Sequence, residues 1–305
     1  MDRYVLKRFL MLFPVLLGIF LLVFVLMRVV PGDPVTLVSG PDVPPETILL
    51  IKKDLGLDKP LYIQFIYYAR EVFRGNLGRS IRTHRSVINE IKLPFINTIK
   101  LTVSSMVLAI LLGILAGVLS SLYQHSKIDY TCMVLAILGV STPSFYLGIL
   151  LILFFSIKLH WLPSGGMNGW EHLILPSITL AAASTAVIAR MTRSSMLEVI
   201  SQEYIVATRA KGVSEWKVIM KHALKNALIP IITVVGLQTG SLLGGAIFVE
   251  YVFSYPGIGW MMVEAISMRD YPVVQGGVLL VASTFVFVNL FTDLIYPLID
   301  RRIKY

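Results

Sequence analysis

The residues of this chain that could do chemistry are spread along it without the spacing that a reactive site needs. The sequence has no GxxxxGK[ST] loop to bind nucleotide phosphates and no HExxH pair to bind zinc. Serine, histidine and aspartate all occur, but no local pattern marks an activated nucleophile. We therefore predict a chain that is not an enzyme, binds no metal or cofactor itself, and takes energy from another protein. The scattered histidines are His84, His125, His160, His172 and His222.

The most distinctive polar stretch is residues 190–230, which we call the elbow; it is charged and lies between long apolar segments. Its apolar residues recur at helical spacing in two groups, which predicts two short amphipathic helices. Gly212 lies between the groups, where a residue without a Cβ can turn the chain. Ser214 is placed to cap the second helix, and Glu215 suits its first turn. The first group is Leu197, Ile200, Tyr204 and Ala207, and the second is Trp216, Ile219, Met220, Ala223, Leu224 and Ala227.

Helices as short as these are marginally stable alone in water, so the elbow needs a surface to dock against. A membrane surface and a groove on another protein both fit its apolar stripes and basic outer face. The basic residues are Arg209, Lys211, Lys217, Lys221 and Lys225.

The composition places the elbow in a membrane protein. Hydrophobic residues make up 56% of the 305, charged residues 15%, and the mean hydropathy is +0.76. These values exclude an ordinary soluble domain. The net charge of +9 does not indicate nucleic-acid binding, because basic residues of membrane proteins gather in their cytoplasmic loops.

The long apolar segments predict an all-α polytopic membrane protein with six transmembrane helices. The first is predicted within an N-terminal unit, 1–30, and follows Arg3, Lys7 and Arg8 without a signal-peptide cleavage site. A small extracytoplasmic domain is expected over 31–98, and a membrane domain over 99–298. The other five spans are expected at about 101–123, 131–157, 173–189, 228–249 and 273–297, with a loop at 190–227 and a tail at 299–305.

The distribution of Lys and Arg predicts the orientation. The short flanks on the side of the N-terminus carry most of these residues, whereas the short loops on the other side carry only Lys158 and Arg269. Positive flanks stay in the cytoplasm, so both termini and the elbow are expected inside.

The predicted spans hold small residues rather than charges. Gly236, Gly240 and Gly244 form two overlapping GxxxG patterns, which favour close helix packing and could also line a translocation path. Gly113 and Gly117 form another. An ion-coupled carrier would need carboxylates or broken helices at mid-depth, so a secondary transporter or channel is the less favoured hypothesis.

The elbow sequence from Glu203 to Pro230 closely resembles the cytoplasmic coupling loop, or EAA loop, of ABC-importer permeases. It is most similar to the first permease, the B type, of the dipeptide, oligopeptide, glutathione and nickel branch. The resemblance extends over nearly the whole chain, in one order and at one spacing. Its further motifs are RYVLKRFL from Arg3, PGDP from Pro31, LGLDKPLYIQF from Leu55, GNLGRS from Gly75, WLPSGG from Trp161, ILPSITL from Ile174, VFSYPGIG from Val252 and RDYPVVQG from Arg269.

The resemblance implies that the elbow docks in a groove of a separate ATPase subunit. Gly212 matches the glycine of the family motif Glu-Ala-Ala-x-x-x-Gly, and Ala207 matches an alanine. Val206 and Thr208 occupy the other two places, so the acidic position is lost, and Glu203 lies three residues too early to replace it. The expected ATPase-coupling residues are Gly212, Ala207, Thr208, Ala210, Glu203 and Ser214.

The family also implies a type I importer permease fold and a bacterial inner-membrane location. The expected partners are a second homologous permease, two ABC ATPases that bind ATP and Mg, an extracytoplasmic binding protein and membrane lipid. The expected cargo is a dipeptide, an oligopeptide or glutathione, with nickel or a metal chelate as the alternative. The sequence assigns no substrate-binding residue.

Overall fold

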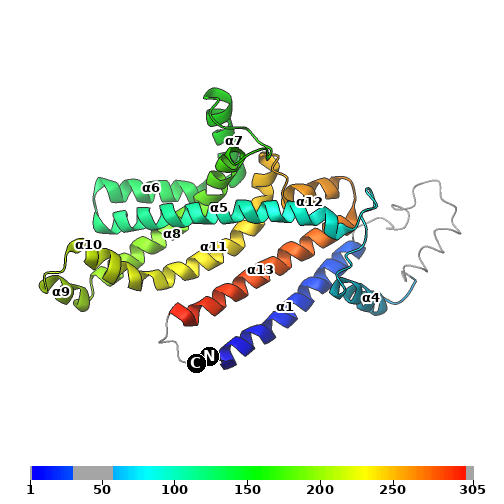
Figure 1. The fold of residues 1–305 in the computed structure, drawn as a ribbon, viewed down its shortest axis with the longest axis horizontal. Coiled ribbons are helices and arrows are strands. Elements are labelled where there is room, and N and C mark those ends of the chain that lie inside the picture. The colour runs from blue at the N-terminus through cyan, green and yellow to red at the C-terminus, as the bar shows by residue number, and fades with distance from the viewer. Residues whose placement is uncertain (1, 30–57, 300–305) are drawn as a thin grey trace.

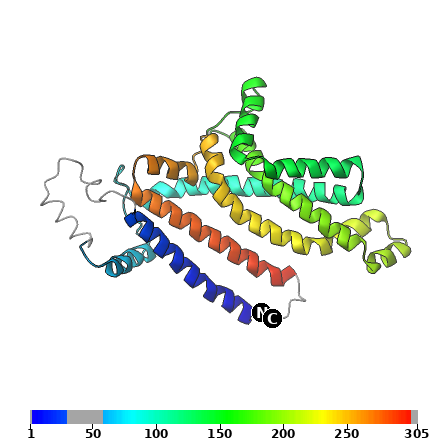
Figure 2. The same cartoon turned by 180° about the vertical axis from the view of Figure 1, so that it is seen from behind.

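The computed structural model describes residues 2–29 and 58–299, which fold as long helices lying side by side (Figure 1). Within these ranges there is no strand beyond an isolated bridge between Arg79 and Ser86. Viewed from behind, the same helices again run lengthwise, with the helices α1 (Asp2–Val29) and α13 (Tyr271–Ile299) neighbouring each other along one side (Figure 2). The all-α prediction is confirmed.

Five described helices are long and apolar enough to cross a membrane. They are α1, α5 (Val87–Leu122), α8 (Glu171–Ile200), α13, and a continuous helical stretch, Glu215–Val252, formed by α10 (Glu215–Lys217), the π-helical segment η2 (Val218–Ala223) and α11 (Leu224–Val252). Many large apolar side chains on these helices are exposed, Leu10, Phe13 and Leu111 among them. Such a surface suits hydrocarbon rather than water.

The span predicted at 131–157 is broken. The helix α6 (Lys127–Ser141) ends before Pro143, and α7 (Ser144–Leu151) with the π-helical η1 (Ile152–Lys158) leaves at an angle of 108°. Pro143 has no backbone N–H and cannot continue a helix, so it begins the next one instead. Only if this bent pair counts as one span does the described chain reach the predicted six.

Three predicted boundaries differ from the helices. The domain predicted to end at residue 98 in fact overlaps α5, which begins at Val87, and the span predicted to end at 189 continues in α8 to Ile200. The fifth span begins before 228, since the helix is continuous from Glu215. The predicted limits follow the apolar runs, whereas the helices continue through polar residues and include Pro94 and Arg193. The rest of the predicted 31–98 domain includes α4 (Leu61–Phe73), and its residues 31–57 lie outside the described residues.

Close packing of α5 on α8 forms the centre of the molecule. A Cβ on Gly113 would lie 2.8 Å from the Ile188 Cβ, and one on Gly117 would overlap Thr192. The GxxxG pair of α5 therefore lets the two backbones approach closely. Leu101, Ala109 and Ile188, all with 0% of their surface exposed, belong to the same core cluster.

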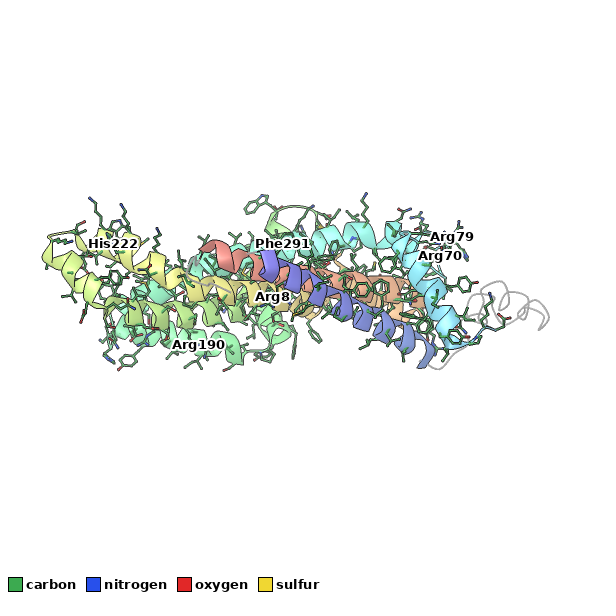
Figure 3. All side chains as sticks on the ribbon, turned by 90° about the horizontal axis from the view of Figure 1, so that it is seen from below. Arg8, Arg70, Arg79, Arg190, His222 and Phe291 are labelled. Carbon is green, nitrogen blue, oxygen red and sulfur yellow. The ribbon has the colours of Figure 1, made fainter. Side chains whose placement is uncertain are left out.

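The two ends of the bundle differ. One end carries α9 (Glu203–Ala210) and α10, and the other carries α4 and α12 (Ile258–Ser267) (Figure 1). With side chains drawn, His222 marks the first end, and Arg70 and Arg79 mark the second (Figure 3). The elbow thus projects from the opposite end to α12.

Candidate functional site

The elbow is built from two helical limbs joined by a tight turn. The first limb, α9, is separated from α8 by Ser201 and Gln202, so the predicted first stripe is divided between two helices. Gly212 has φ +76°, a left-handed conformation that disfavours residues with a Cβ. A Cβ there would meet no atom within 4 Å, so the constraint on Gly212 comes from its backbone alone. The predicted turn at Gly212 is confirmed.

The second limb differs from the prediction of a short, separate helix. It starts at Glu215 and runs on into the membrane span. Ser214 precedes it at the N-cap position, yet its side chain makes no capping hydrogen bond. Any force on the turn therefore acts directly on a continuous helix that ends at Val252.

Two side-chain contacts brace the turn. Arg209 donates from Nε and Nη2 to the two carboxylate oxygens of Glu215, at 3.1 and 2.6 Å. This bidentate bond raises the pKa of Arg209 above its usual value. Tyr204 contacts the second limb through its hydroxyl, which donates to the His222 carbonyl and accepts from Asn226 at 2.6 Å. The two limbs are thereby fixed relative to one another.

The predicted coupling residues lie on the exposed side of this braced unit. Thr208 is half-buried and donates to the Tyr204 carbonyl at 2.6 Å. On the inward side, Ile205 is fully buried and packs into the core with Met196 and Val218. The elbow therefore has an anchored face and a free face. The free face includes Glu203, Ala207, Ala210, Gly212 and Ser214.

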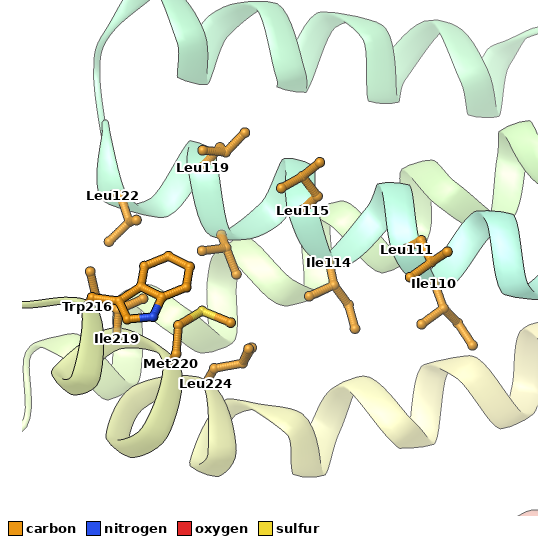
Figure 4. Close-up of a pocket in the computed structure, with 11 residues that line it drawn as sticks. Ile110, Leu111, Ile114, Leu115, Leu119, Leu122, Trp216, Ile219, Met220 and Leu224 are labelled. Carbon is orange, nitrogen blue, oxygen red and sulfur yellow. The ribbon is translucent and has the colours of Figure 1, made fainter.

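An apolar groove of about 290 Å³ separates the second limb from the elbow end of α5 (Figure 4). Trp216, which is 71% exposed, and Met220 project into it toward Leu119 and Leu122. Its lining is entirely apolar, which suits the bilayer interior. The second limb thus faces α5 across apolar side chains.

A part-buried ion pair joins the start of α6 to α8, the helix that leads to the elbow. Asp129, at the start of α6, accepts two bonds from Arg193 of α8, at 2.7 and 2.8 Å, and further bonds from the Ser120 hydroxyl and the His125 N–H. Sequence reasoning did not predict this pair, because its two residues lie 64 positions apart in the chain. The sequence does contain one indication of the pair, since Asp129 and Arg193 carry opposite charges and each borders a long apolar segment.

The GxxxG residues of α11 have two different environments. A Cβ on Gly236 would overlap Thr292, and one on Gly240 would lie 2.9 Å from the Phe285 ring, so both face α13. Gly244 has no such neighbour within 4 Å. Packing within the chain therefore accounts for the first two, whereas Gly244 has open space beside it.

Two buried carboxylates at the opposite end were also missed. Glu250 is 0% exposed and Asp270 is 5% exposed. Glu250 falls one residue beyond the predicted span 228–249, so it was not considered as a membrane charge. Neither belongs to a metal cluster, since the described ranges contain no group of three His, Cys, Asp or Glu side chains that could hold an ion.

Two family models together match nearly the whole chain, and both describe components of transport systems in the inner membrane. The family of binding-protein-dependent transport system inner membrane components matches residues 109–305, and the N-terminal part of that family matches residues 1–102. The chain belongs to this family.

Curated relatives match over the full length of both chains. The glutathione transport system permease protein GsiC of Salmonella typhimurium is 46% identical over 305 residues, and that of Escherichia coli K12 is 45% identical. Both alignments cover 100% of this chain and 100% of the relative. The chain is thus similar throughout to permease proteins.

Solved structures of ABC transporters share the fold. A chain of the MetNI methionine ABC transporter, in inward-facing conformations, has a TM-score of 0.59 at 21% identity and covers 69% of this chain and 96% of its own length. An amino acid ABC transporter with histidines gives 0.51 at 17% identity, covering 69% and 92%. The fold is that of a type I importer permease in the inner membrane, and membership of the family implies ATPase and binding-protein partners.

Proposed function

We propose that this chain is one half of the translocation pathway of an ATP-driven importer and that its elbow is the contact with an ATPase subunit. The observation that carries the proposal is the construction of the elbow. Its tip is exposed over Ala207, Ala210 and Gly212, yet Arg209–Glu215 and Tyr204–Asn226 hold its shape. A preformed, exposed surface of this kind binds a partner without an ordering cost.

The continuous helix from Glu215 to Val252 supports a lever mechanism. A displacement of the docked elbow moves this helix as a unit, past α5 across the apolar groove, and alters the far end near α12. ATP binding in the partner would thereby switch the pathway between inward- and outward-facing forms. The elbow and both termini then lie in the cytoplasm, with α4 and α12 outside, in agreement with the distribution of Lys and Arg.

The proposed cargo is glutathione or a similarly small peptide-like solute. Support comes from full-length identity of 45–46% to permeases named for glutathione transport. The proposed assembly contains a second, different permease of the same family, two ATPases that bind ATP and Mg, and an extracytoplasmic binding protein.

The test is uptake of radiolabelled glutathione into proteoliposomes that contain the chain with its partner subunits. We expect uptake that requires both ATP and the binding protein and that unlabelled glutathione suppresses. Uptake of nickel or of a metal chelate in place of glutathione would overturn the proposed cargo. Uptake by this chain alone, driven by an ion gradient, would overturn the proposed mechanism.

A further inference from the structure

The helix α12 lies at the end of the molecule opposite to the elbow (Figure 1). It has 10 residues, which at about 1.5 Å per residue is half the length needed to cross a bilayer. It lies beside the first turns of α5 and α13 and also contacts α11 (Figure 1). Its inner side, with Ile258 and Met262, packs with Val87 and Ile91 of α5. A short apolar helix in this place must be positioned by its contacts.

The N-terminus of α12 is held by Glu250 of α11 and Thr98 of α5. One Glu250 carboxylate oxygen accepts from the N–H groups of Gly259 and Trp260, at 2.7 and 3.2 Å. The other accepts from the Thr98 hydroxyl, which in turn accepts from the Ile258 N–H at 2.8 Å. These two side chains, which we call the latch, are 0% and 1% exposed. They join three separate helices in one hydrogen-bond network.

Further contacts hold the segment just before α12. Asn97 donates to the Pro256 carbonyl at 2.9 Å, and the Tyr255 hydroxyl donates to the Asn97 carbonyl at 3.2 Å. From the loop after η1, the Gly166 N–H donates to the Phe253 carbonyl at 2.9 Å. The WLPSGG and VFSYPGIG motifs therefore meet here, beside the latch.

Both ends of α12 carry backbone strain. Ser254, before the helix, has φ +46°, and Arg269, after it, has φ +56°. Left-handed conformations of residues other than glycine persist only where surrounding contacts fix them. Asp270 supplies such contacts at the second end, accepting from the Ser80 hydroxyl and from the Ile81 N–H. The helix thus has a strained residue just before it and another just after it, and a buried carboxylate lies close to each in the chain.

We propose that the latch positions α12 as the closure of the extracytoplasmic end and that coupling of ATP hydrolysis to substrate transport depends on it. Glu250 and Thr98 are then positioning residues, since they act through α12. A buried carboxylate is costly unless its hydrogen bonds are all made, and a hydrophobic pair would hold α12 less specifically. The inference rests on the proposed function. It adds to that function a structural element, α12, that controls the extracytoplasmic end of the transport path.

The test compares two variants of one residue. Thr98→Val keeps the shape of the side chain but removes its hydroxyl, which leaves a Glu250 oxygen and the Ile258 N–H without their partner. Thr98→Ser keeps the hydroxyl and is the matched control. Both are made in a Cys132→Ser background that carries Met262→Cys as a reporter, because Met262 is only 6% exposed.

The first measurement is the rate at which a membrane-impermeant maleimide labels position 262 from outside. We expect Thr98→Val to raise this rate about tenfold over Thr98→Ser, which corresponds to about 1.4 kcal/mol in the opening of α12. An equal labelling rate in the two variants would overturn the proposal that the latch positions α12. This measurement needs no transport. It therefore tests whether the latch holds α12 in place even if the proposed function is wrong.

The second measurement is the number of substrate molecules taken up per ATP hydrolysed, at equal amounts of assembled complex. We expect a severalfold lower ratio for Thr98→Val, with ATP hydrolysis that no longer needs the binding protein, and a normal ratio for Thr98→Ser. Faster labelling with an unchanged ratio would mean that the latch serves stability alone, and would overturn the proposed role. Absence of ATP-driven uptake in the parent chain would instead count against the proposed function.

Discussion

At the scale of single residues, the elbow depends on a few side chains whose partners are not their sequence neighbours. Gly212 was predictable because a glycine between two amphipathic stripes indicates a turn. The contact of Tyr204 with Asn226, and that of Arg193 with Asp129, were not, since each joins residues far apart in the chain. Glu250 was missed because it falls just beyond the predicted span 228–249, and its bond from Thr98 of α5 joins residues far apart in the chain.

The left-handed backbone of Gly212 gives the first prediction at this scale. Gly212→Val puts a β-branched residue at φ +76°, which costs about 1–2 kcal/mol and shifts the turn away from its docking shape. We expect ATP-driven uptake to fall about tenfold, in keeping with that cost, while the chain still inserts and folds. Uptake is measured in proteoliposomes at matched protein levels.

Two control variants distinguish a specific effect on ATPase coupling from a general effect of backbone strain on the protein. Gly212→Asn should retain most uptake, because asparagine tolerates the left-handed region. Gly75→Val introduces the same strain at φ +79°, also in open space, but in the segment after α4. Wild-type uptake by Gly212→Val, or an equal loss in Gly75→Val, would contradict the coupling role of Gly212.

At the scale of elements, the apolar segments predicted the spans but not their limits. Long hydrophobic runs are sufficient to identify spanning helices, as α5, α8 and α13 illustrate. Charges were expected to end helices, yet Arg193 lies within α8 because Asp129 neutralises it. Pro143 indicates a kink in this span, but the size of the bend, 108°, depends on where α7 packs, against α8 and α11, which no local pattern specifies.

The environments of two α11 glycines give a matched prediction about helix packing. Gly236→Ala would drive a methyl group into Thr292 of α13, whereas Gly244→Ala would place the same group in open space. Overpacking of this kind costs about 1–3 kcal/mol. We therefore expect a lower thermal unfolding midpoint for Gly236→Ala in detergent and little change for Gly244→Ala. Equal midpoints would show that α11 and α13 do not pack as described.

Gly244 also allows the packing and pathway hypotheses to be distinguished. If its open face lines the translocation path or the second permease, Gly244→Leu should lower uptake in the assembled complex without lowering the unfolding midpoint of the isolated chain. The same substitution at Gly236 should lower both. Unchanged uptake in Gly244→Leu would remove this face from the pathway.

At the scale of the whole molecule, the two ends of one helix bundle differ in construction. The elbow end is exposed and braced, which suits the proposed partner that delivers force, and the α12 end contains two buried carboxylates, Glu250 and Asp270. The helix from Glu215 to Val252 connects them without a break. Composition and motif order predicted the fold class and the family, but the connection between the ends became visible only in three dimensions.

The central claim is that a separate ATPase subunit binds the elbow. It is tested most directly by photocrosslinking from Ala207, on the exposed side of α9, in membranes that contain the assembled complex. The control position is Ile266, which is 59% exposed on α12 at the opposite end. The account predicts that position 207 captures an ATPase subunit and that position 266 does not. Capture of lipid alone from position 207 would contradict it.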